Sequence, residues 1–270
     1  MWTFEGQALR WAAKSIASLD CDYAHAEFSD GRMAITGDDL ATKLQLSVPA
    51  ISAGMPFTCG LPADLLSRIL KSMGDGDATV ARHNERVILT SGESDASLRT
   101  STEIPDLRRV QFPDLGGTVK RARLTAAFEA VGTAASTDAT SSLHGVRLEA
   151  SRGDSWVVAC DRYRMHAVMM TGRLGFGEPV TIPTNALKLV SSVGDQVVKV
   201  GTSDGTFFVQ GDSGRMSTNG IAGDFISDWA SHLKIPKNPE TVAEFDSTDL
   251  VAAVRQVHEP LGCDTVTLAL

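Results

Sequence analysis

Four stretches of the sequence carry apolar residues at the spacing of an amphipathic helix. In residues 4–18, Leu9, Ala12 and Ile16 recur every three to four positions and so share one helical face. Before a second such stretch stands Pro62, a residue favoured in the first turn of a helix. The predicted helices are therefore residues 4–18, 63–72, 124–133 and 184–192.

Alternating apolar and polar residues predict strands between these helices. The run from Lys43 to Val48 is an example, because every second side chain in it is apolar. Turns rich in Gly, Asp and Ser separate several such runs. The same pattern predicts strands at 23–28, 32–36, 78–80, 86–90, 96–101, 143–149, 154–160, 165–170, 197–201, 206–210 and 215–219.

The order of these elements repeats along the chain. A repeat of about 120 residues is a whole domain, because solenoid units have only about 20 to 50 residues. We therefore interpret the chain as one domain type that is duplicated. The intervals are 122 positions from Asp39 to Asp161, 121 from Pro62 to Pro183, 120 from Gly74 to Gly194 and 119 from Leu9 to Phe128.

Runs of strands with two short helices per copy predict an α+β fold, with the helices on one face of antiparallel sheets. We place one domain at 1–117, a second at 118–235, and a linker with the start of a third at 236–270. A helix at 249–257 and a strand at 265–270 could not bury a core alone. Either this tail packs on a neighbour or it belongs to a longer product, and we favour the second explanation.

The composition is that of a folded protein without a membrane span. Apolar residues make up 43% and charged residues 21% of the chain, and no apolar run approaches the roughly 20 residues that span a bilayer. The first residues do not form a secretory signal. Cys21, Cys59, Cys160 and Cys263 have neither CxxC spacing nor a disulfide pattern. We therefore expect a cytoplasmic protein without cofactor or metal.

The acidic net charge argues against tight binding to nucleic acid. The formal charge is −8 and the isoelectric point is near 5.2, whereas tight DNA binders carry a basic excess. One locally basic face could still contact DNA. Such contact would be weak and very sensitive to salt.

The stretch 157–170 is the first candidate for a binding surface. Two apolar, strand-forming segments flank Asp161-Arg162-Tyr163-Arg164, and Tyr and Arg are enriched at protein interfaces. The alternative is a polar hairpin turn between two core strands, since turns are generally polar.

The repeat and several motifs together resemble the bacterial DNA polymerase III sliding clamp, the β subunit. No single motif is diagnostic, but their order and spacing are fairly specific, and the divergence is typical of a distant or phage-encoded member. The resemblance covers two domains and the start of a third. The motifs lie at Thr36–Leu40, Leu143–Leu148, Val158–Met165, Gly223–Trp229 and Ile235–Pro239.

This resemblance implies a non-enzymatic processivity factor that encircles double-stranded DNA. In the family, two three-domain subunits close head to tail, with sheets outside and helices lining a central hole, and the ring tethers a polymerase. A sliding ring needs a mildly positive bore, which fits the acidic total. The basic residues on predicted helices, which we expect to face DNA, are Arg10, Lys14, Arg68, Lys71, Lys188 and Arg255.

The resemblance also implies a pocket for short apolar peptides of the polymerase and the clamp loader, between the second and third domains. Its third-domain side would lie beyond Leu270. An apolar floor beside one arginine would suit such a peptide. By position in the family motif, the pocket residues are Leu143, Cys160, Tyr163, Arg164, Met165, Pro236 and Val242.

Two departures from the family pattern bear on DNA binding. The loop 136–142 is small and neutral apart from Asp138, where some members carry basic and aromatic residues. The segment 19–23 is short and lacks the basic residue often found there. A second hypothesis is therefore a clamp-fold module that docks peptides and never encircles DNA.

An enzyme is the third hypothesis, with a site built from Asp161, His166 and Cys160. We find no GxSxG, HExxH or P-loop motif, and the six histidines have no ligand spacing. No set of nucleophile, base and orienting group is visible in the sequence. We therefore rank this hypothesis last.

Overall fold

The computed structural model describes residues 1–74, 76–101, 113–114, 117–151, 153–172, 174–226, 228–232, 248–249 and 252. The chain divides into one compact unit, Met1–Phe225, and a second unit, Ile226–Leu270. In the second unit the structure describes the short helix α5 (Trp229–His232) and a few other residues. The predicted helix 249–257 and strand 265–270 lie outside the described residues, except for helical positions at 249 and 252.

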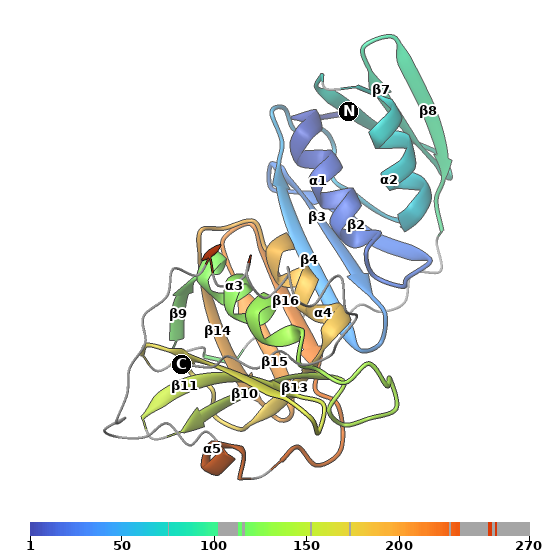
Figure 1. Cartoon of the computed structure of the whole chain (residues 1–270). Helices are drawn as coiled ribbons and strands as arrows, with labels where there is room; N and C mark the ends of the chain where they lie inside the picture. Colours follow the sequence, from blue (N-terminus) through green and yellow to red (C-terminus); the bar gives the residue numbers. More distant parts are fainter. Residues whose placement is uncertain are drawn as a thin grey trace. The chain divides into compact units, whose positions relative to one another are not determined.

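In its described residues the first repeat has two helices and eight strands, and α1 lies beside α2 (Figure 1). The elements in order are β1 (Trp2–Phe4), α1 (Gly6–Ile16), β2 (Tyr23–Ser29), β3 (Arg32–Asp38), β4 (Thr42–Pro49), β5 (Phe57–Pro62), α2 (Ala63–Ser72), β6 (Ala78–His83), β7 (Arg86–Ser91) and β8 (Ser94–Arg99).

The second repeat has the same order of elements. They are β9 (Gly117–Lys120), α3 (Arg121–Gly132), β10 (Gly145–Ser151), β11 (Asp154–Cys160), β12 (Met165–Met170), β13 (Val180–Pro183), α4 (Thr184–Leu189), the 3-10 helix η1 (Val190–Ser192), β14 (Val197–Ser203), β15 (Thr206–Gln210) and β16 (Gly214–Asn219). Every predicted helix and strand of the two repeats is therefore present.

Three antiparallel sheets connect these elements, as the α+β prediction requires. Two have four strands, in the orders β1-β6-β7-β8 and β12-β11-β10-β13. The third has eight strands, in the order β5-β2-β3-β4-β16-β15-β14-β9, because β4 of the first repeat pairs with β16 of the second. One continuous sheet therefore crosses from one repeat to the next (Figure 1).

The registers of strand pairing repeat at the intervals found in the sequence. Ile35 pairs with Leu46 between β3 and β4, and Val157 pairs with Val168 between β11 and β12, 122 positions later in both strands. In the second half of each repeat the interval is 120, since the pair Leu89–Ala96 recurs as Val209–Met216. The duplication thus extends to individual backbone pairs.

The structure corrects the alignment of the first helix in each repeat. The buried residues Leu9, Ala12, Ala13 and Ile16 of α1 recur in α3 as Leu124, Ala127, Phe128 and Val131, at an interval of 115. Leu9 therefore matches Leu124, and the pairing of Leu9 with Phe128 is wrong by one helical turn. Seven additional residues separate α3 from β10, since the following strands are 122 apart. Both positions are apolar, so composition could not distinguish them.

The sequence pattern does not predict four of the strands, β1, β5, β9 and β13. Each leads directly into a helix, and the residues at the four junctions are Glu5, Pro62, Lys120 and Pro183. None of them makes the side-chain hydrogen bond by which Ser, Thr, Asp or Asn commonly marks a helix start. Without that signal, the first predicted helix was extended backward through Phe4, which lies in β1.

A close backbone approach at β9 gives a test of the fold. Gly117 lies so near Leu174 that an added Cβ would overlap the Leu174 backbone, whereas nothing lies within 4 Å of a Cβ at Gly132. We expect Gly117→Ala to lower the free energy of unfolding by about 1–3 kcal/mol, because the backbones must separate. Gly132→Ala, at the end of α3, should be neutral or stabilising by up to about 1 kcal/mol. Urea unfolding of both variants measures the difference, and equal stabilities would contradict the close approach.

Candidate functional site

The turn between β11 and β12 is a copy of the turn between β3 and β4. In the second repeat, Asp161 Oδ1 accepts hydrogen bonds from the backbone N–H groups of Tyr163 and Arg164, at 3.1 and 3.0 Å. In the first repeat, Asp39 Oδ1 accepts the equivalent bonds from Ala41 and Thr42, at 3.1 and 2.6 Å. The residue after the aspartate is left-handed in both turns, with φ of 79° at Arg162 and 73° at Leu40. The aspartate therefore has a structural role at the turn.

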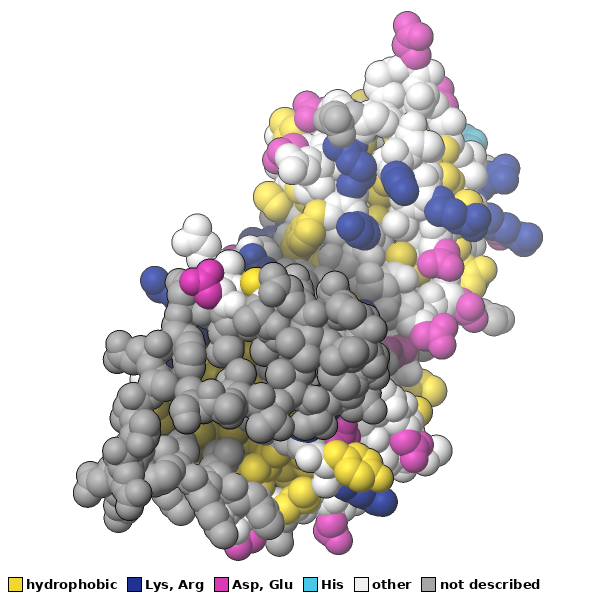
Figure 2. Space-filling view, in the orientation of Figure 1, with side chains coloured by type: hydrophobic (Ala, Val, Ile, Leu, Met, Phe, Trp, Pro, Cys, Tyr) yellow, Lys and Arg dark blue, Asp and Glu magenta, His cyan; other side chains and the backbone are white. Residues whose placement is uncertain are grey.

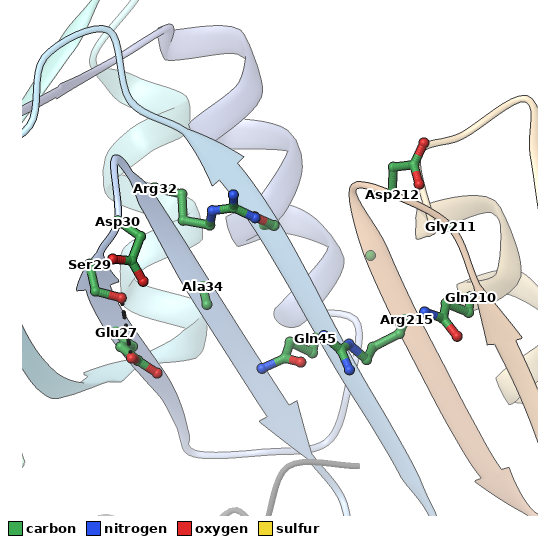
Figure 3. A pocket seen from close by; sticks show the side chains of 12 residues that line it. Glu27, Ser29, Asp30, Arg32, Ala34, Gln45, Gln210, Gly211, Asp212 and Arg215 are labelled. Atoms are coloured by element: carbon green, nitrogen blue, oxygen red, sulfur yellow. Dashed lines mark hydrogen bonds between the residues drawn. The ribbon is translucent and has the colours of Figure 1, made fainter. Parts of the chain in front are cut away.

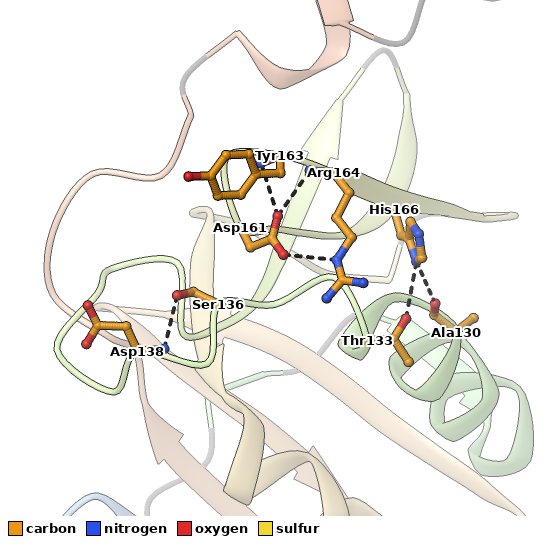
Figure 4. Close-up of polar contacts among 8 residues, drawn as sticks. All are labelled: Ala130, Thr133, Ser136, Asp138, Asp161, Tyr163, Arg164 and His166. Carbon is orange, nitrogen blue, oxygen red and sulfur yellow. Dashed lines mark hydrogen bonds and ion pairs between the residues drawn. The ribbon is translucent and has the colours of Figure 1, made fainter. Parts of the chain in front are cut away.

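The side chains of this turn are held in different ways (Figure 4). Arg164 Nε donates to Asp161 Oδ2 at 2.9 Å, while the ring of Tyr163 is 96% exposed. Desolvation raises the pKa of Asp161, but the hydrogen bonds from Tyr163 and Arg164 and the charge of Arg164 outweigh it and hold that pKa below its ordinary value. The carboxylate thus stays ionised and keeps Arg164 oriented.

The outward faces of the equivalent strands differ between the repeats. Successive side chains of a strand point to opposite sides, and one side faces the hydrophobic core. We call the opposite side the outward face of the strand. In the first repeat this face pairs Asp38 with Lys43 and Thr36 with Gln45. A salt bridge of 3.4 Å joins Asp38 to Lys43, and Gln45 Nε2 donates to Thr36 Oγ1 at 3.3 Å.

At the equivalent positions of the second repeat every one of these residues is apolar. Cys160 pairs with Met165, Val158 with Ala167, and Met169 follows two residues later on the same face. Met169 is 46% exposed, and Met165 and Ala167 are half-buried. We call Met165, Ala167 and Met169 the apolar stripe. Since the two repeats share one backbone pattern, this change in chemistry is not required by the fold.

The outward face of the eight-stranded sheet stays polar where β4 meets β16. A groove of about 410 Å³ lies across this junction. Arg32, Gln45, Gln210 and Arg215 point into it from four strands, two in each repeat (Figure 3). The change to apolar residues is therefore confined to β11 and β12 of the second repeat.

The structure brings together part of the predicted peptide pocket. Cys160, Tyr163, Arg164 and Met165 all lie at the β11–β12 hairpin. Leu143 is buried just before β10. The predicted residues Pro236 and Val242 lie outside the described residues. Ala167 and Met169 were not among the predicted residues, although strand alternation from Met165 would have identified them.

Phe225 and Arg147 also lie near this region and were missed. The guanidinium of Arg147 in β10 stacks 5.6 Å from the centre of the Phe225 ring. The segment before Phe225 is fixed through Asp224, whose carbonyl accepts a 2.7 Å hydrogen bond from Ser142 Oγ. These contacts join residues about 80 positions apart, which sequence reasoning could not pair.

Five of the six predicted DNA-facing residues lie on helices. Arg10 and Lys14 are on α1, Arg68 and Lys71 on α2, and Lys188 on α4. Figure 2 shows dark blue side chains gathered over α1 and α2. The sixth, Arg255, lies outside the described residues.

Two arginines on the helices have a structural role. Arg10 donates through its guanidinium to the carbonyl of Gly74, in the turn that follows α2. In the second repeat, Arg121 Nε donates to the carbonyl of Asp195 at 2.8 Å, and its NH1 donates to Ser191 at 2.9 Å. Each repeat thus uses an arginine of its first helix to satisfy carbonyl groups at or after the end of its second helix.

Two acidic residues near α3 would repel DNA. Glu129 of α3 is exposed at the position equivalent to Lys14 of α1. In the loop 136–142, Asp138 Oδ1 accepts hydrogen bonds from the hydroxyl and the N–H of Thr140, at 2.7 and 2.9 Å. These bonds lower the pKa of Asp138, so the loop carries a negative charge.

The structure does not assemble the enzyme site of Asp161, His166 and Cys160. Cys160 pairs with Met165, so the next residue, His166, points to the opposite face of the sheet. There its Nδ1 lies 3.2 Å from the carbonyl oxygen of Ala130 (Figure 4). Burial raises the pKa of the Cys160 thiol, as does Asp161, and together they outweigh the hydrogen bond from the Arg162 backbone that lowers it. The thiol is therefore a poor nucleophile.

Within the part of the chain that the structure describes, no group of three or more His, Cys, Asp or Glu side chains could hold a metal ion. In the same residues no helix is long and apolar enough to cross a bilayer.

The sequence comparisons find no match, whereas the comparison of structures finds several. No family model and no curated protein matches the sequence. The DNA polymerase β subunit of Streptococcus pyogenes matches with a TM-score of 0.78 at 18% identity, over 96% of this chain and 73% of that one. The polymerase III β subunit of Thermotoga maritima gives 0.77 at 17%, over 97% and 75%. A Pseudomonas aeruginosa sliding clamp bound to griselimycin gives 0.74 at 18%, over 88% and 68%.

The chain has the sliding-clamp fold. The fold predicted from the order and spacing of the motifs is thereby confirmed. At these identities the likeness establishes architecture alone, so the function depends on the surfaces described above.

Proposed function

We propose that this chain is a subunit of a DNA sliding clamp. It would form a ring around duplex DNA, without enzymatic activity, and hold a replicative polymerase and other partners through the apolar outward face of β11 and β12. The observation that carries the proposal is the pairing of β4 with β16.

This pairing defines how one repeat joins the next. The strands equivalent to β4 and β16 are β12 and β8, which lie 122 positions after β4 and 120 positions before β16. Both stand at the end of a sheet in the described part of the chain. Within the described residues, one chain therefore carries both halves of this junction, each without a partner strand. Such surfaces join copies head to tail, and rings form when the rotation closes.

The charges suit a ring that slides. Lys14, Arg68, Lys71 and Lys188 are exposed on helices. The net charge of −8 opposes a tight grip on a polyanion. Weak, salt-sensitive contact is what movement along DNA requires. A ring of two three-domain subunits, acting in the cytoplasm, would use these residues without reading sequence.

The partner surface follows from the comparison of the repeats. The apolar stripe on β12 borders the turn that positions Arg164. Apolar side chains next to one oriented guanidinium suit a short peptide with large apolar residues, such as a polymerase or a clamp loader would present. Leu143, Cys160 and Tyr163 would complete this side of the pocket, and Pro236 and Val242 the linker side.

The experiment compares circular with linear DNA, because a ring can slide off a free end but not off a closed circle. The protein, with a clamp loader where needed, is bound to nicked circular DNA and to the same DNA after linearisation, and retention is measured at raised salt. We expect retention on the circle and release from the free ends, because a ring slides off them. Equal release from both forms would reject encirclement.

A second candidate is a clamp-fold module that docks peptides and does not encircle DNA. The negatively charged loop around Asp138 and the exposed Glu129 favour it, because both would repel phosphates. The same experiment decides between the two functions. Peptide binding with equal release from circular and linear DNA would select the docking module.

A further inference from the structure

A groove between α1 and α4 joins the two repeats on their helical side. It has a volume of about 490 Å³ and is lined by residues of α1 and of α4 with η1. Lys14 lines it from the first repeat and Lys188 from the second. We call it the junction groove. It is the place where two of the predicted DNA-facing residues, far apart in sequence, share one cavity.

The charge of the junction groove is positive. Its lining residues include the two lysines and no Asp or Glu. Among the residues that the structure describes, neither Lys14 nor Lys188 forms an ion pair, and both side chains are exposed. Two ammonium groups without a counter-charge in one cavity attract an anion more strongly than separate surface lysines do.

Hydrogen-bond donors accompany this charge. The amide oxygen of Asn185 accepts a 2.9 Å bond from the N–H of Ala186, so its NH₂ group remains available as a donor. The half-buried Trp11 is also among the lining residues. Ser18 and Ser191 donate their protons to the carbonyl oxygens of Lys14 and Lys188, at 3.0 and 2.6 Å. These two bonds hold the serine side chains against the helices.

The neighbouring groove between α3 and α4 has different chemistry. It has about 460 Å³, and Phe128, Leu187 and Glu129 are among its lining residues. Lys188 borders this groove too. An anion next to Lys188 is therefore repelled on the α3 side by Glu129 and attracted on the α1 side by Lys14.

We propose that the junction groove is a phosphate site, in which Lys14 and Lys188 hold one phosphodiester of DNA between them. This inference rests on the proposed function, because it assigns the DNA contact to particular atoms. The two lysines then act as one contact. With either of them removed, the phosphate is held from one side and leaves the groove.

A double-mutant cycle tests this coupling. Binding of the full chain to a short duplex is measured by fluorescence anisotropy over a range of salt concentrations, for Lys14→Ala, Lys188→Ala and the double variant. We expect each single variant to weaken binding about tenfold at low salt and the double variant to weaken it little further. In the double variant, the slope of log affinity against log salt should become less steep by about 0.9, the value for one lost phosphate contact.

Lys71→Ala and Lys188→Ala provide the control pair, since Lys71 lies on α2, outside the junction groove, and Lys188 lies on α4. Their effects should add, because additivity holds for sites that share no partner. Additive effects of Lys14→Ala and Lys188→Ala, with a fall in slope of about 1.8, would overturn the shared site.

A second experiment tests the phosphate site if the chain does not bind DNA. If the unaltered chain binds no duplex, then amide NMR signals are followed while inorganic pyrophosphate is added. Shifts at Lys14 and Lys188 that vanish in the double variant would keep the phosphate site and assign it to free phosphates. No shift at either residue would reject the site.

Discussion

Ser97→Pro should prevent the assembly of this chain into a ring. Ser97 lies in β8 and is exposed. Its equivalent in the second repeat, 120 positions later, is Ser217 of β16, which pairs with Lys43 of β4. We expect assembly to weaken by at least about tenfold, because proline removes one backbone donor and places its ring at the junction. Sedimentation or native mass spectrometry at several concentrations measures the change.

The backbone pattern of the existing junction explains why this residue is chosen. The N–H of Asn219 donates to the carbonyl of Ala41 at 2.8 Å, so the odd-numbered residues of β16 face β4. In an antiparallel strand the backbone N–H and C=O groups of successive residues point to opposite neighbouring strands. The backbone groups of the odd-numbered residues of β8 therefore point to its open edge. The bonds between β8 and β7 then remain, and the subunit should keep its fold.

Ser97→Thr is the control, because it keeps the N–H and is well suited to a strand. Circular dichroism and thermal unfolding check that both variants fold alike. If Ser97→Pro assembles as well as Ser97→Thr does, then β8 is not part of the junction. Head-to-tail closure through the pairing of β8 with a strand equivalent to β4 would then be rejected.

The sequence predicted the long periodic elements well, for a physical reason. Helices such as α2 and strands such as β4 bury one face, and burial imposes a periodic pattern on the residues. The strands β1 and β9 have three and four residues, too few to show a period. Their partners, β6 and β14, lie more than 70 residues away in sequence, so pairing that decides their conformation cannot be read locally.

The candidate sites were predicted less completely. Tyr163, Arg164 and Met165 are predicted together because the motif places them next to one another, and their role in a pocket stays a prediction. The groove that Lys14 shares with Lys188 depends on the packing of α1 and α4, which are about 170 positions apart in the sequence. No rule of residue spacing predicts such a contact. Lys14 and Lys188 were predicted as two separate contacts.

The duplication itself distinguishes function from structure in this chain. Residues that both repeats share, such as Asp39 and Asp161, stabilise the same turn twice. Residues that differ at equivalent positions are free of that requirement. The change from Ser47 in β4 to Met169 in β12 is of this kind, and a methionine that is 46% exposed gains only part of the stabilisation that full burial would give.

Met169→Glu should therefore remove partner binding and leave the fold intact. A carboxylate placed in an apolar peptide contact must lose its water on binding, and nothing in the apolar stripe compensates for that loss. We expect the affinity for a polymerase-derived peptide rich in leucine and phenylalanine to fall by at least about tenfold, as at an interface hot spot. Isothermal titration calorimetry on the full chain measures it.

Ser47→Glu is the matched control, since it places the same carboxylate at the equivalent position of the first repeat. It should leave peptide affinity unchanged, because the polar outward face of that repeat binds no such peptide. Equal losses in the two variants would point to a general electrostatic effect on the peptide. Unchanged binding by Met169→Glu, with the fold checked by thermal unfolding, would place the partner surface elsewhere than on β12.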